Sequence, residues 1–269
     1  MNDRANFTSL VDALSPWAHQ IVFVGGWAHR LYRLHPKART PVYQPLATLD
    51  ADVAFRNGER LEGSVKTRLQ DAGFKEQLTG NHQPPVSRYT LGKDENSGFY
   101  AEFLTPLIGR PLTKDGKSIA TLAKADITAQ RLRYLELLLE SPWTVTLTPD
   151  WGAESPMDLR IPNPVSFVVQ KLLIYDDRSI DKKAQDILYI HDTLELFASD
   201  LDYLAAIWRN EVRQSLHSRW LQALARSKAS VFGEPNDRLR DAAAIPQDRE
   251  LDPERMRAMC LAMLGEILE

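Results

Sequence analysis

The sequence predicts an α/β amino-terminal part followed by an all-helical carboxyl-terminal part. Two short apolar strand patterns, 20–26 and 48–55, lie in the first part on either side of a helical pattern. From Pro164 onward, apolar residues recur at the i, i+3, i+4 and i+7 positions typical of packed helices. The chain has 269 residues, of which 43% are apolar and 26% charged, so it is long enough for one large domain or two smaller ones.

Charge and cysteine content narrow the class of protein. The formal net charge of −3 lacks the basic excess of a general nucleic-acid binder, although a local basic patch stays open. The single cysteine, Cys260, rules out an intramolecular disulfide and fits a reducing compartment. The first ten residues carry no leader pattern, and no stretch approaches the roughly 20 apolar residues of a membrane span. We therefore expect a cytoplasmic protein without a membrane partner.

The strands can be justified in chain order. Residues 20–26, QIVFVGG, form an apolar run that ends in two glycines, which is typical of a central strand buried on both faces. Residues 48–55, TLDADVAF, alternate between apolar and other residues, which predicts a strand with one buried face. The leucine-rich segment 127–140 favours a helix. Further strands are expected at 75–79, 86–92, 99–104, 143–149 and 157–164, the last two returning to the sheet.

Asp50 and Asp52 lie on the same face of the strand 48–55. The strand rise puts their Cβ atoms roughly 6–7 Å apart. Two carboxylates at this spacing repel each other, and the run contains no lysine or arginine. At an exposed sheet edge, water tolerates such a pair. In a concave site the pair needs a cation, and a hard divalent metal is the chemically suited one.

Two further features have both a structural and a functional interpretation. Gly25 and Gly26 lie between a buried strand and a helix, where a glycine backbone lets a phosphate approach, but the same pair is also common in a plain tight turn. Glu102 is a carboxylate in the otherwise apolar strand 99–104. It is either a member of a site or part of the solvated outer face of an edge strand.

The combination of strand, Gly-Gly, helix, Asp-x-Asp strand and lone-carboxylate strand resembles the nucleotidyltransferase superfamily over residues 20–104. The proline-rich gap before Asp50, and glycine where many members carry serine, are similar to the AbiEii-like nucleotidyltransferase toxin branch. Thr48 matches that pattern, whereas Leu46 replaces a usual arginine. The resemblance implies a nucleotidyltransferase-like α/β (α+β) domain with a mixed sheet over residues 1–162, followed by an all-helical domain over 163–269.

The segment IPNPVSFVVQKLLIYDDRSIDKKAQDILYI resembles the lysine motif of the same branch, with Lys171, Arg178, Lys182 and Asp186 at its positions and Lys183 as a departure. From the residues alone, Lys171 either extends along an apolar helix to the surface or holds a triphosphate. Lys182 and Asp186 are four residues apart and either form an ion pair or, in the case of Lys182, add positive potential beside phosphates or RNA.

The resemblance implies transfer of a nucleoside monophosphate from an NTP to a hydroxyl acceptor such as tRNA or another macromolecule. It implies Mg²⁺, or Mn²⁺ in its place, as cofactor and a cognate antitoxin protein as partner. The implied metal ligands are Asp50, Asp52 and Glu102. The implied catalytic residues are Asp50, Asp52, Glu102, Lys171 and Asp186. The implied nucleotide-binding residues are Gly25, Gly26, Thr48, Lys171, Arg178 and Lys182.

Two alternatives remain compatible with the residues. The first is a non-catalytic protein on the same fold that binds a nucleotide or a partner. The second is a metal-dependent nuclease built from the same carboxylates, which needs no NTP. An Asp50→Ala change separates the first alternative from an enzyme, because an enzyme loses turnover whereas a metal-free binding protein keeps its partner.

Overall fold

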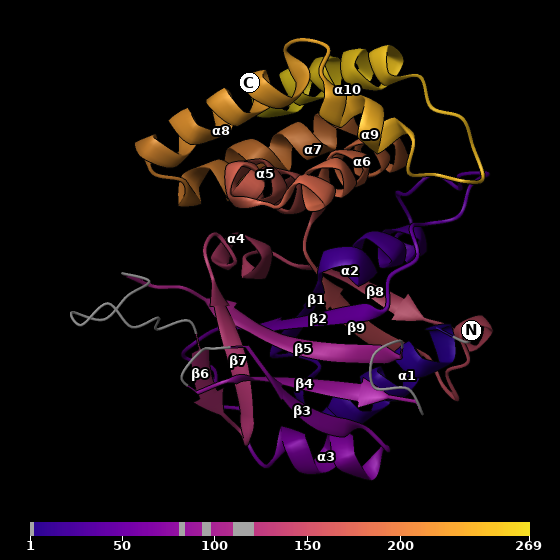
Figure 1. The fold of residues 1–269 in the computed structure, drawn as a ribbon, viewed down its shortest axis with the longest axis vertical. Coiled ribbons are helices and arrows are strands. Elements are labelled where there is room, and N and C mark those ends of the chain that lie inside the picture. Colours follow the sequence, from indigo (N-terminus) through magenta and orange to yellow (C-terminus); the bar gives the residue numbers. More distant parts are fainter. Residues whose placement is uncertain (1–2, 81–83, 93–97, 110–120) are drawn as a thin grey trace. The chain divides into compact units, whose positions relative to one another are not determined.

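The computed structural model describes residues 3–80, 84–92, 98–109 and 121–269 (Figure 1). The chain divides into two compact units. The first, called the α/β unit, contains Met1–Leu34 and Ala47–Pro162. The second, called the helical unit, contains His35–Leu46 and Asn163–Glu269. The segment 35–46, which the sequence prediction assigns to the first domain, therefore lies with the helical unit.

A mixed sheet forms the centre of the α/β unit. Its strands are β1 (Ile21–Val24), β2 (Asp50–Phe55), β3 (Lys75–Thr79), β4 (Val86–Leu91), β5 (Phe99–Pro106), β6 (Thr121–Lys124) and β7 (Ile127–Leu132). The strand order is β1-β2-β5-β4-β3, with β7 beside β5 and β6 beside β7. β5 pairs in parallel with β2 and β7, and the other pairs are antiparallel. This arrangement confirms the predicted fold class.

Strand β1 has the expected burial but not the expected position. All four of its residues are buried, as the apolar run predicts. However, the strand lies at one end of the sheet order instead of in the centre. Apolar side chains cover it on both faces, because Val22 and Val24 join a buried cluster and Phe23 meets Phe7 with ring centroids 5.2 Å apart. An end strand covered in this way carries the same sequence pattern as a central one.

Two other strand and helix predictions are wrong in part. The segment 127–140 splits into strand β7 and the short helix α4 (Glu136–Leu139), so its leucines serve two elements. Strands β8 (Trp143–Leu147) and β9 (Met157–Ile161) form as predicted but pair with each other in a separate two-stranded sheet. Sequence periodicity identifies strands, but their partners depend on contacts far apart in the chain.

The two faces of the main sheet have different cover. On one face, Ala54 and Leu104 pack with Val22, Val24 and the leucines around α4. On the other face lies an aromatic cluster supplied partly by helices α1 (Asp3–Leu14) and α2 (Gly25–Leu31). Phe7 stacks on Trp27 with centroids 4.0 Å apart, and Trp27 meets Phe99 edge-on. Helix α3 (Val65–Asp71) connects β2 to β3.

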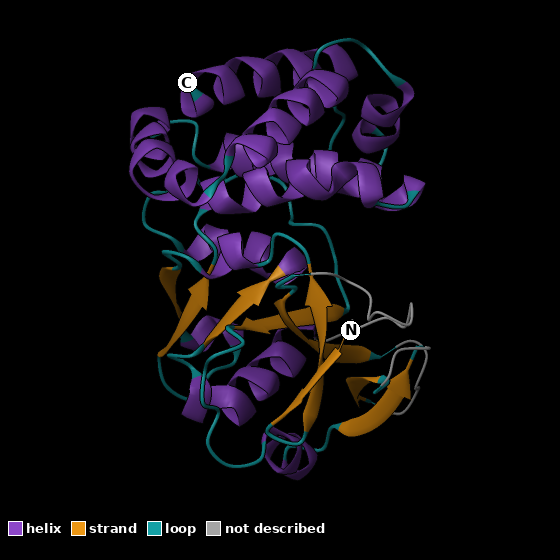
Figure 2. Cartoon of the chain, turned by 90° about the vertical axis from the view of Figure 1, so that its left-hand side faces the viewer, coloured by secondary structure: helices purple, strands orange, loops and turns teal. Residues whose placement is uncertain are grey.

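The described residues of the helical unit form helices and loops without a strand (Figure 2). The helices are α5 (Pro164–Ile174), α6 (Ile180–Leu196), α7 (Leu201–Ile207), α8 (Ser218–Phe232), α9 (Asp237–Ala243) and α10 (Pro253–Leu268). Helix α5 begins with Pro164 at its first position. The Asn163 side chain caps this helix by accepting a hydrogen bond from the Ser166 amide at 2.8 Å. No helix in the described residues has both the length and the apolar character needed to cross a membrane.

The segment 35–46 is attached to the helical unit by backbone and side-chain contacts. The Arg39 amide donates to the Leu196 carbonyl at 2.8 Å. The Tyr43 hydroxyl donates to the Glu195 carboxylate at 2.6 Å, and the Arg249 guanidinium lies 3.4 Å from the Tyr43 ring centroid. These contacts explain why the segment groups with helices that follow it by more than a hundred residues.

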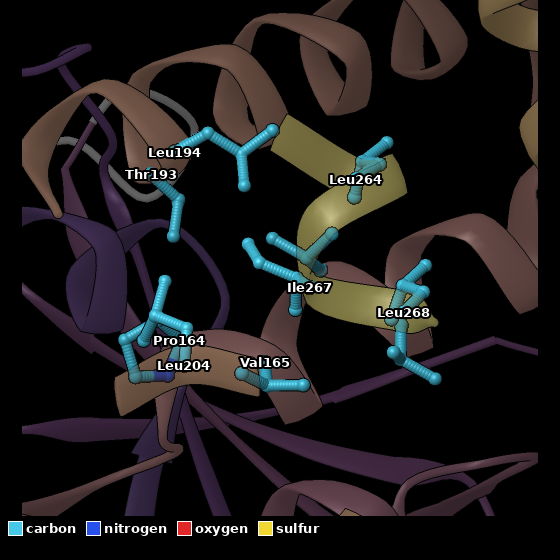
Figure 3. A pocket seen from close by; sticks show the side chains of 10 residues that line it. Pro164, Val165, Thr193, Leu194, Leu204, Leu264, Ile267 and Leu268 are labelled. Atoms are coloured by element: carbon cyan, nitrogen blue, oxygen red, sulfur yellow. The ribbon is translucent and has the colours of Figure 1, made fainter. Parts of the chain in front are cut away.

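A small apolar cavity lies among helices α5, α6, α7 and α10 (Figure 3). Its volume is about 10 Å³, which is room for one water molecule at most. Thr193 lines it, and within the described residues its buried hydroxyl oxygen has no hydrogen-bond partner. The cavity is a packing defect, since it is too small to hold a ligand.

Candidate active site

Three predicted carboxylates lie on one face of the main sheet. Asp50 and Asp52 alternate along β2, and the parallel pairing places Asp52 directly opposite Glu102 of β5. Asp50 lies opposite Tyr100 in the same register. The structure thus brings together side chains that are fifty residues apart in the chain. All three acidic residues are partly accessible, in contrast to the fully buried alanines between them.

Thr48 contacts Asp50 directly. Its hydroxyl is within hydrogen-bonding range of the Oδ1 atom of Asp50, and Thr48 itself is buried. A hydroxyl that donates to a carboxylate restricts the rotation of that carboxylate. The sequence resemblance assigns Thr48 to nucleotide binding, whereas the contact in the structure is with Asp50.

Gly25 packs its backbone against Asp52. The residue has a φ of +64°, a conformation that side chains other than glycine adopt rarely. A Cβ atom at this position would overlap the Oδ2 atom of Asp52. The positive φ therefore favours glycine at position 25, and a side chain there would also have to displace the Asp52 carboxylate. Gly26 follows in the first turn of α2 and is partly accessible.

Glu102 forms an ion pair with Arg88 of the neighbouring strand β4. The Nε and Nη2 atoms of Arg88 lie 2.8 Å and 2.7 Å from the same oxygen, Oε1 of Glu102. Among the described residues, the oxygens of Asp50, Asp52 and Glu102 do not all approach within 4.8 Å of one another. Oε1 of Glu102 is already occupied by Arg88, which leaves the other carboxylate oxygen, Oε2, without this contact.

Tyr100 completes the face beside Asp50. The Arg88 guanidinium carbon lies 4.2 Å from the centroid of its ring. Burial raises the pKa of Tyr100 to about 12, and the negative charges of Asp50 and Glu102 contribute to the rise. The hydroxyl therefore stays protonated at neutral pH and remains able to donate a hydrogen bond.

The helical unit holds the residues of the predicted lysine motif. The buried carboxylate of Asp186 on α6 accepts from Lys171 Nζ at 2.5 Å and from Arg178 Nε at 2.9 Å. The Lys171 side chain is only 6% exposed, and its ammonium lies 4.9 Å and 4.7 Å from the rings of Phe167 and Tyr189. Lys171 therefore does not reach the surface along its helix. The Arg178 side chain is 36% exposed and is the accessible member of the group.

Lys182 does not pair with Asp186. The ion pair, one of the two interpretations of their spacing, does not form, because Lys171 and Arg178 occupy both oxygens of Asp186. The Lys182 ammonium instead lies 3.2 Å from the side-chain oxygen of Gln185, on the exposed side of α6. The four-residue spacing is favourable on a helix surface, but Asp186 points into the core.

A second acidic group lies in the helical unit. Within the described chain, His191, Asp192 and Glu195 offer three ligand atoms within 4.8 Å of one another. Arg249 neutralises much of this group, because its Nη2 atom lies 2.6 Å from both oxygens of Asp192 and its Nη1 atom 3.6 Å from Glu195. The His191 Nδ1 atom lies 2.9 Å from Asp192. We interpret the group as an ion-pair network that already contains its cation.

Sequence reasoning missed Arg88 and Tyr100. Both lie in segments that are correctly predicted as strands, and an arginine in the apolar run VSRYTL is a visible signal. Their relevance comes from the strand register, which places Arg88 opposite Glu102 and Tyr100 opposite Asp50. That register joins β4 to β5 and β5 to β2, and no local pattern specifies it.

Three comparisons with known proteins bear on the family of this chain. No match was found among the curated proteins. Among solved structures, the chain is similar to MenT4, the nucleotidyltransferase toxin Rv2826c from Mycobacterium tuberculosis H37Rv, with 12% identity and a TM-score of 0.36. That alignment covers 97% of this chain and 92% of the other. A family model described as Nucleotidyltransferase matches residues 2–213. This match spans most of the chain, which therefore belongs to the nucleotidyltransferase family.

Proposed function

We propose that the protein transfers a nucleoside monophosphate from an NTP to a hydroxyl group of an RNA acceptor. Membership of the nucleotidyltransferase family supports the reaction class. The observation that carries the proposal is the sheet face on which Asp50, Asp52 and Glu102 lie in register beside Gly25. Like charges gathered on one face, next to a backbone without a side chain, suit a site for a metal-bound polyphosphate.

The carboxylates fit a divalent cation by their chemistry. Oxygen donors from aspartate and glutamate are the ligands that Mg²⁺ prefers, and Mn²⁺ accepts the same set. We propose that Asp50 and Asp52 hold the cation and that Glu102 is the third ligand through the oxygen that does not contact Arg88. When bound, such a cation supplies charge stabilisation for the attacking and leaving oxygens. Thr48 keeps the Asp50 carboxylate in one orientation.

The backbone at Gly25 and Gly26 is proposed to lie against the phosphates. Gly25 lies directly against the Asp52 carboxylate, so a phosphate at this turn would lie beside a proposed ligand of the cation. A phosphate there is close to the carboxylates that hold the cation. The close fit between Gly25 and Asp52 supports this assignment.

The cationic residues of the helical unit are proposed to bind phosphate groups. Arg178 and Lys182 are the more accessible ones. Lys171 is proposed to act with them, and Asp186 to position both Lys171 and Arg178 through its two oxygens.

An RNA acceptor, with tRNA as one candidate, is supported by charge segregation within the helical unit. Residues 209–228 contain five arginines and lysines but one glutamate, in a chain whose net charge is −3. None of these five cations has an ion pair within the described residues, and the four arginines among them are exposed. The cations are Arg209, Arg213, Arg219, Arg226 and Lys228. Exposed, unpaired cations attract a phosphate backbone.

We further propose that the protein is the toxin of a toxin–antitoxin pair, with a cognate antitoxin as its protein partner. The support is the similarity of the motif from Ile161 to Ile190 to the AbiEii-like toxin branch. A toxin of this kind should arrest growth when it is expressed without its partner. The arrest should depend on the same carboxylates as the nucleotidyl transfer.

Labelled nucleotide tests the proposal. Purified protein, Mg²⁺ and each α-labelled NTP in turn are incubated with total cellular RNA and cell protein. We expect label to enter RNA with the wild type and to fall at least about 100-fold with Asp52→Asn, because a ligand of the cation is lost. Asp71→Asn, which changes an exposed carboxylate at the end of α3, is the matched control. On expression in cells, the wild type and Asp71→Asn should arrest growth, whereas Asp52→Asn should not.

Three outcomes contradict the proposal. Label that enters protein but not RNA overturns the acceptor class. Label that enters RNA equally with wild type and Asp52→Asn overturns the assignment of the site. Absence of transfer with all four NTPs, alongside measurable NTP binding, favours a non-catalytic binding protein on the same fold.

A further inference from the structure

Arg88 lies at the edge of the carboxylate face and has a geometry suited to a second partner. Its Nε and Nη2 atoms both donate to one oxygen of Glu102, at 2.8 Å and 2.7 Å. A guanidinium carries five N–H donors, so the remaining donors, including both on Nη1, are not used by this contact. The Arg88 side chain is 33% exposed, which leaves these donors within reach of a ligand.

We propose that Arg88 binds the β- and γ-phosphates of the NTP and the pyrophosphate that leaves, with Glu102 and Tyr100 as its positioning residues. This inference rests on the proposed nucleotidyl transfer. No sequence motif singles out Arg88, and the assignment comes from strand register alone. Planar, forked donors match phosphate oxygens, which is why arginine is suited to this role.

The register places Arg88 beside the site. Asp52, Glu102 and Arg88 occupy one row across β2, β5 and β4. Neighbouring strands are about 4.8 Å apart, so the row spans about 10 Å from the first residue to the last. The Arg88 side chain reaches back along this row to Glu102, which brings its guanidinium closer to Asp52 than its own strand is. The outer phosphates of a polyphosphate whose α-phosphate lies at Asp52 then meet the one cation of the row.

Two contacts keep the guanidinium in this place before a ligand arrives. Glu102 holds it on one side by the shared oxygen, and the Tyr100 ring lies 4.2 Å from its central carbon. An arginine restrained in this way loses less conformational freedom on binding than a freely rotating one. The ring and the carboxylate therefore prepare Arg88 for a planar contact with phosphate.

Nucleotidyl transfer places negative charge on the leaving group, which a cation such as Arg88 can stabilise. In nucleotidyl transfer, an acceptor oxygen forms a bond to the α-phosphorus and loses its proton to solvent. The bond from the α-phosphorus to the bridging oxygen breaks, and its electron pair leaves with pyrophosphate. Negative charge therefore grows on the β-phosphate, where the donors of Arg88 stabilise it.

Binding of inorganic tripolyphosphate tests the inference without requiring turnover. Calorimetric titrations with Mg²⁺ and tripolyphosphate compare the wild type with Arg88→Gln and Arg88→Lys in the full chain. We expect Arg88→Gln to weaken binding at least about tenfold and Arg88→Lys to weaken it less, because lysine keeps the charge but loses the fork. The matched control is Arg60→Gln. The Arg60 side chain is 90% exposed, and its contact with the exposed Glu62 is long, at 3.7 Å.

A second readout separates phosphate binding from a purely structural role. Mn²⁺ binding without phosphate, measured by electron paramagnetic resonance, should stay within about twofold of wild type in Arg88→Gln and fall strongly in Asp52→Asn. Equal tripolyphosphate affinity of Arg88→Gln and wild type overturns the inference. So does a loss of Mn²⁺ binding in Arg88→Gln as large as in Glu102→Gln, because Arg88 then acts only through Glu102.

The two proposals can fail separately. If the wild type binds tripolyphosphate through Arg88 but transfers no nucleotide, the proposed function fails and the phosphate site remains. If the wild type transfers nucleotide while Arg88→Gln binds tripolyphosphate normally, the function stands and the role of Arg88 is contradicted. Circular dichroism of each variant confirms that a change in binding does not come from unfolding.

Discussion

At the scale of single residues, the described structure contains one position that favours glycine and one buried hydroxyl without a hydrogen bond. Gly25 is the position that favours glycine, because its φ of +64° strains other residues and a Cβ atom would have to displace the Asp52 carboxylate. Thr193 carries the buried hydroxyl. Its hydroxyl is buried beside an apolar cavity and, within the described residues, makes no hydrogen bond (Figure 3). A buried polar group without a partner lowers the free energy of unfolding.

Thr193→Val is therefore expected to stabilise the protein. The change replaces a hydroxyl by a methyl group of similar size, which removes the desolvation cost and should raise the free energy of unfolding by about 1 kcal/mol. Thr193→Ser is the matched control, because it keeps the hydroxyl and enlarges the cavity, and it should lower the free energy of unfolding. Urea denaturation followed by circular dichroism measures both. A valine variant less stable than wild type would show that the hydroxyl has a partner.

The acidic residues of the candidate site could be predicted from the sequence, but their neighbours could not. Alternation along TLDADVAF places Asp50 and Asp52 on one face, and this follows from strand geometry alone. Arg88 and Tyr100 gain their meaning from the pairing of β4, β5 and β2, which brings together residues far apart in the chain. Local periodicity contains no information about such a register.

At the scale of elements, a buried ion group joins helices α5 and α6. Asp186 of α6 is fully buried and holds Lys171 of α5 and Arg178 of the connecting segment. Removing one partner of such a group leaves an uncompensated charge in the core. Replacing the buried pair by apolar residues removes both charges and is often close to neutral for stability. This contrast separates the structural role of the group from its proposed role in phosphate binding.

Asp186→Ala is expected to lower the free energy of unfolding by about 3–5 kcal/mol, because Lys171 then stays buried without its carboxylate. The double variant Lys171→Met with Asp186→Leu should recover most of that loss. Thermal and urea unfolding measure the stability of both variants. If the folded double variant still transfers nucleotide at the wild-type rate, Lys171 and Asp186 serve the fold alone.

The elements themselves show where sequence prediction stops. The α/β part and the helical part follow from periodicity, whereas the mixed sheet is what the family resemblance implies, and all three are confirmed. The position of β1 at the end of the sheet and the separate pairing of β8 with β9 do not follow from it. Covered end strands and central strands bury the same residues, so their sequences look alike. Helix α4 is short because strand β7 takes up the first half of the segment 127–140.

At the scale of the whole molecule, the chain leaves the α/β unit at residue 34, returns at residue 47 and leaves again at residue 162. Residues 35–46, between the first exit and the return, contribute Tyr43 to the helical unit. Tyr43 combines a hydrogen bond to Glu195 with stacking against Arg249. This segment directly precedes the strand that carries Asp50 and Asp52 in the sequence.

Two variants of Tyr43 measure that attachment. Tyr43→Phe removes only the hydrogen bond and should lower the free energy of unfolding by about 1 kcal/mol. Tyr43→Ala also removes the ring under Arg249 and should cost about 3–4 kcal/mol in total. Limited proteolysis within residues 35–46 should accelerate in Tyr43→Ala and change little in Tyr43→Phe. Equal stability of the alanine variant and wild type would show that other contacts hold the segment.

The central claim is that the carboxylate face of the α/β unit carries out nucleotidyl transfer. The most direct test measures, in one reaction, the pyrophosphate released from an NTP and the nucleoside monophosphate joined covalently to RNA. The account predicts equal molar amounts of both products with the wild type and neither product with Asp52→Asn. Release of pyrophosphate or phosphate without a matching gain of nucleotide on RNA, or unchanged products with Asp52→Asn, would contradict it.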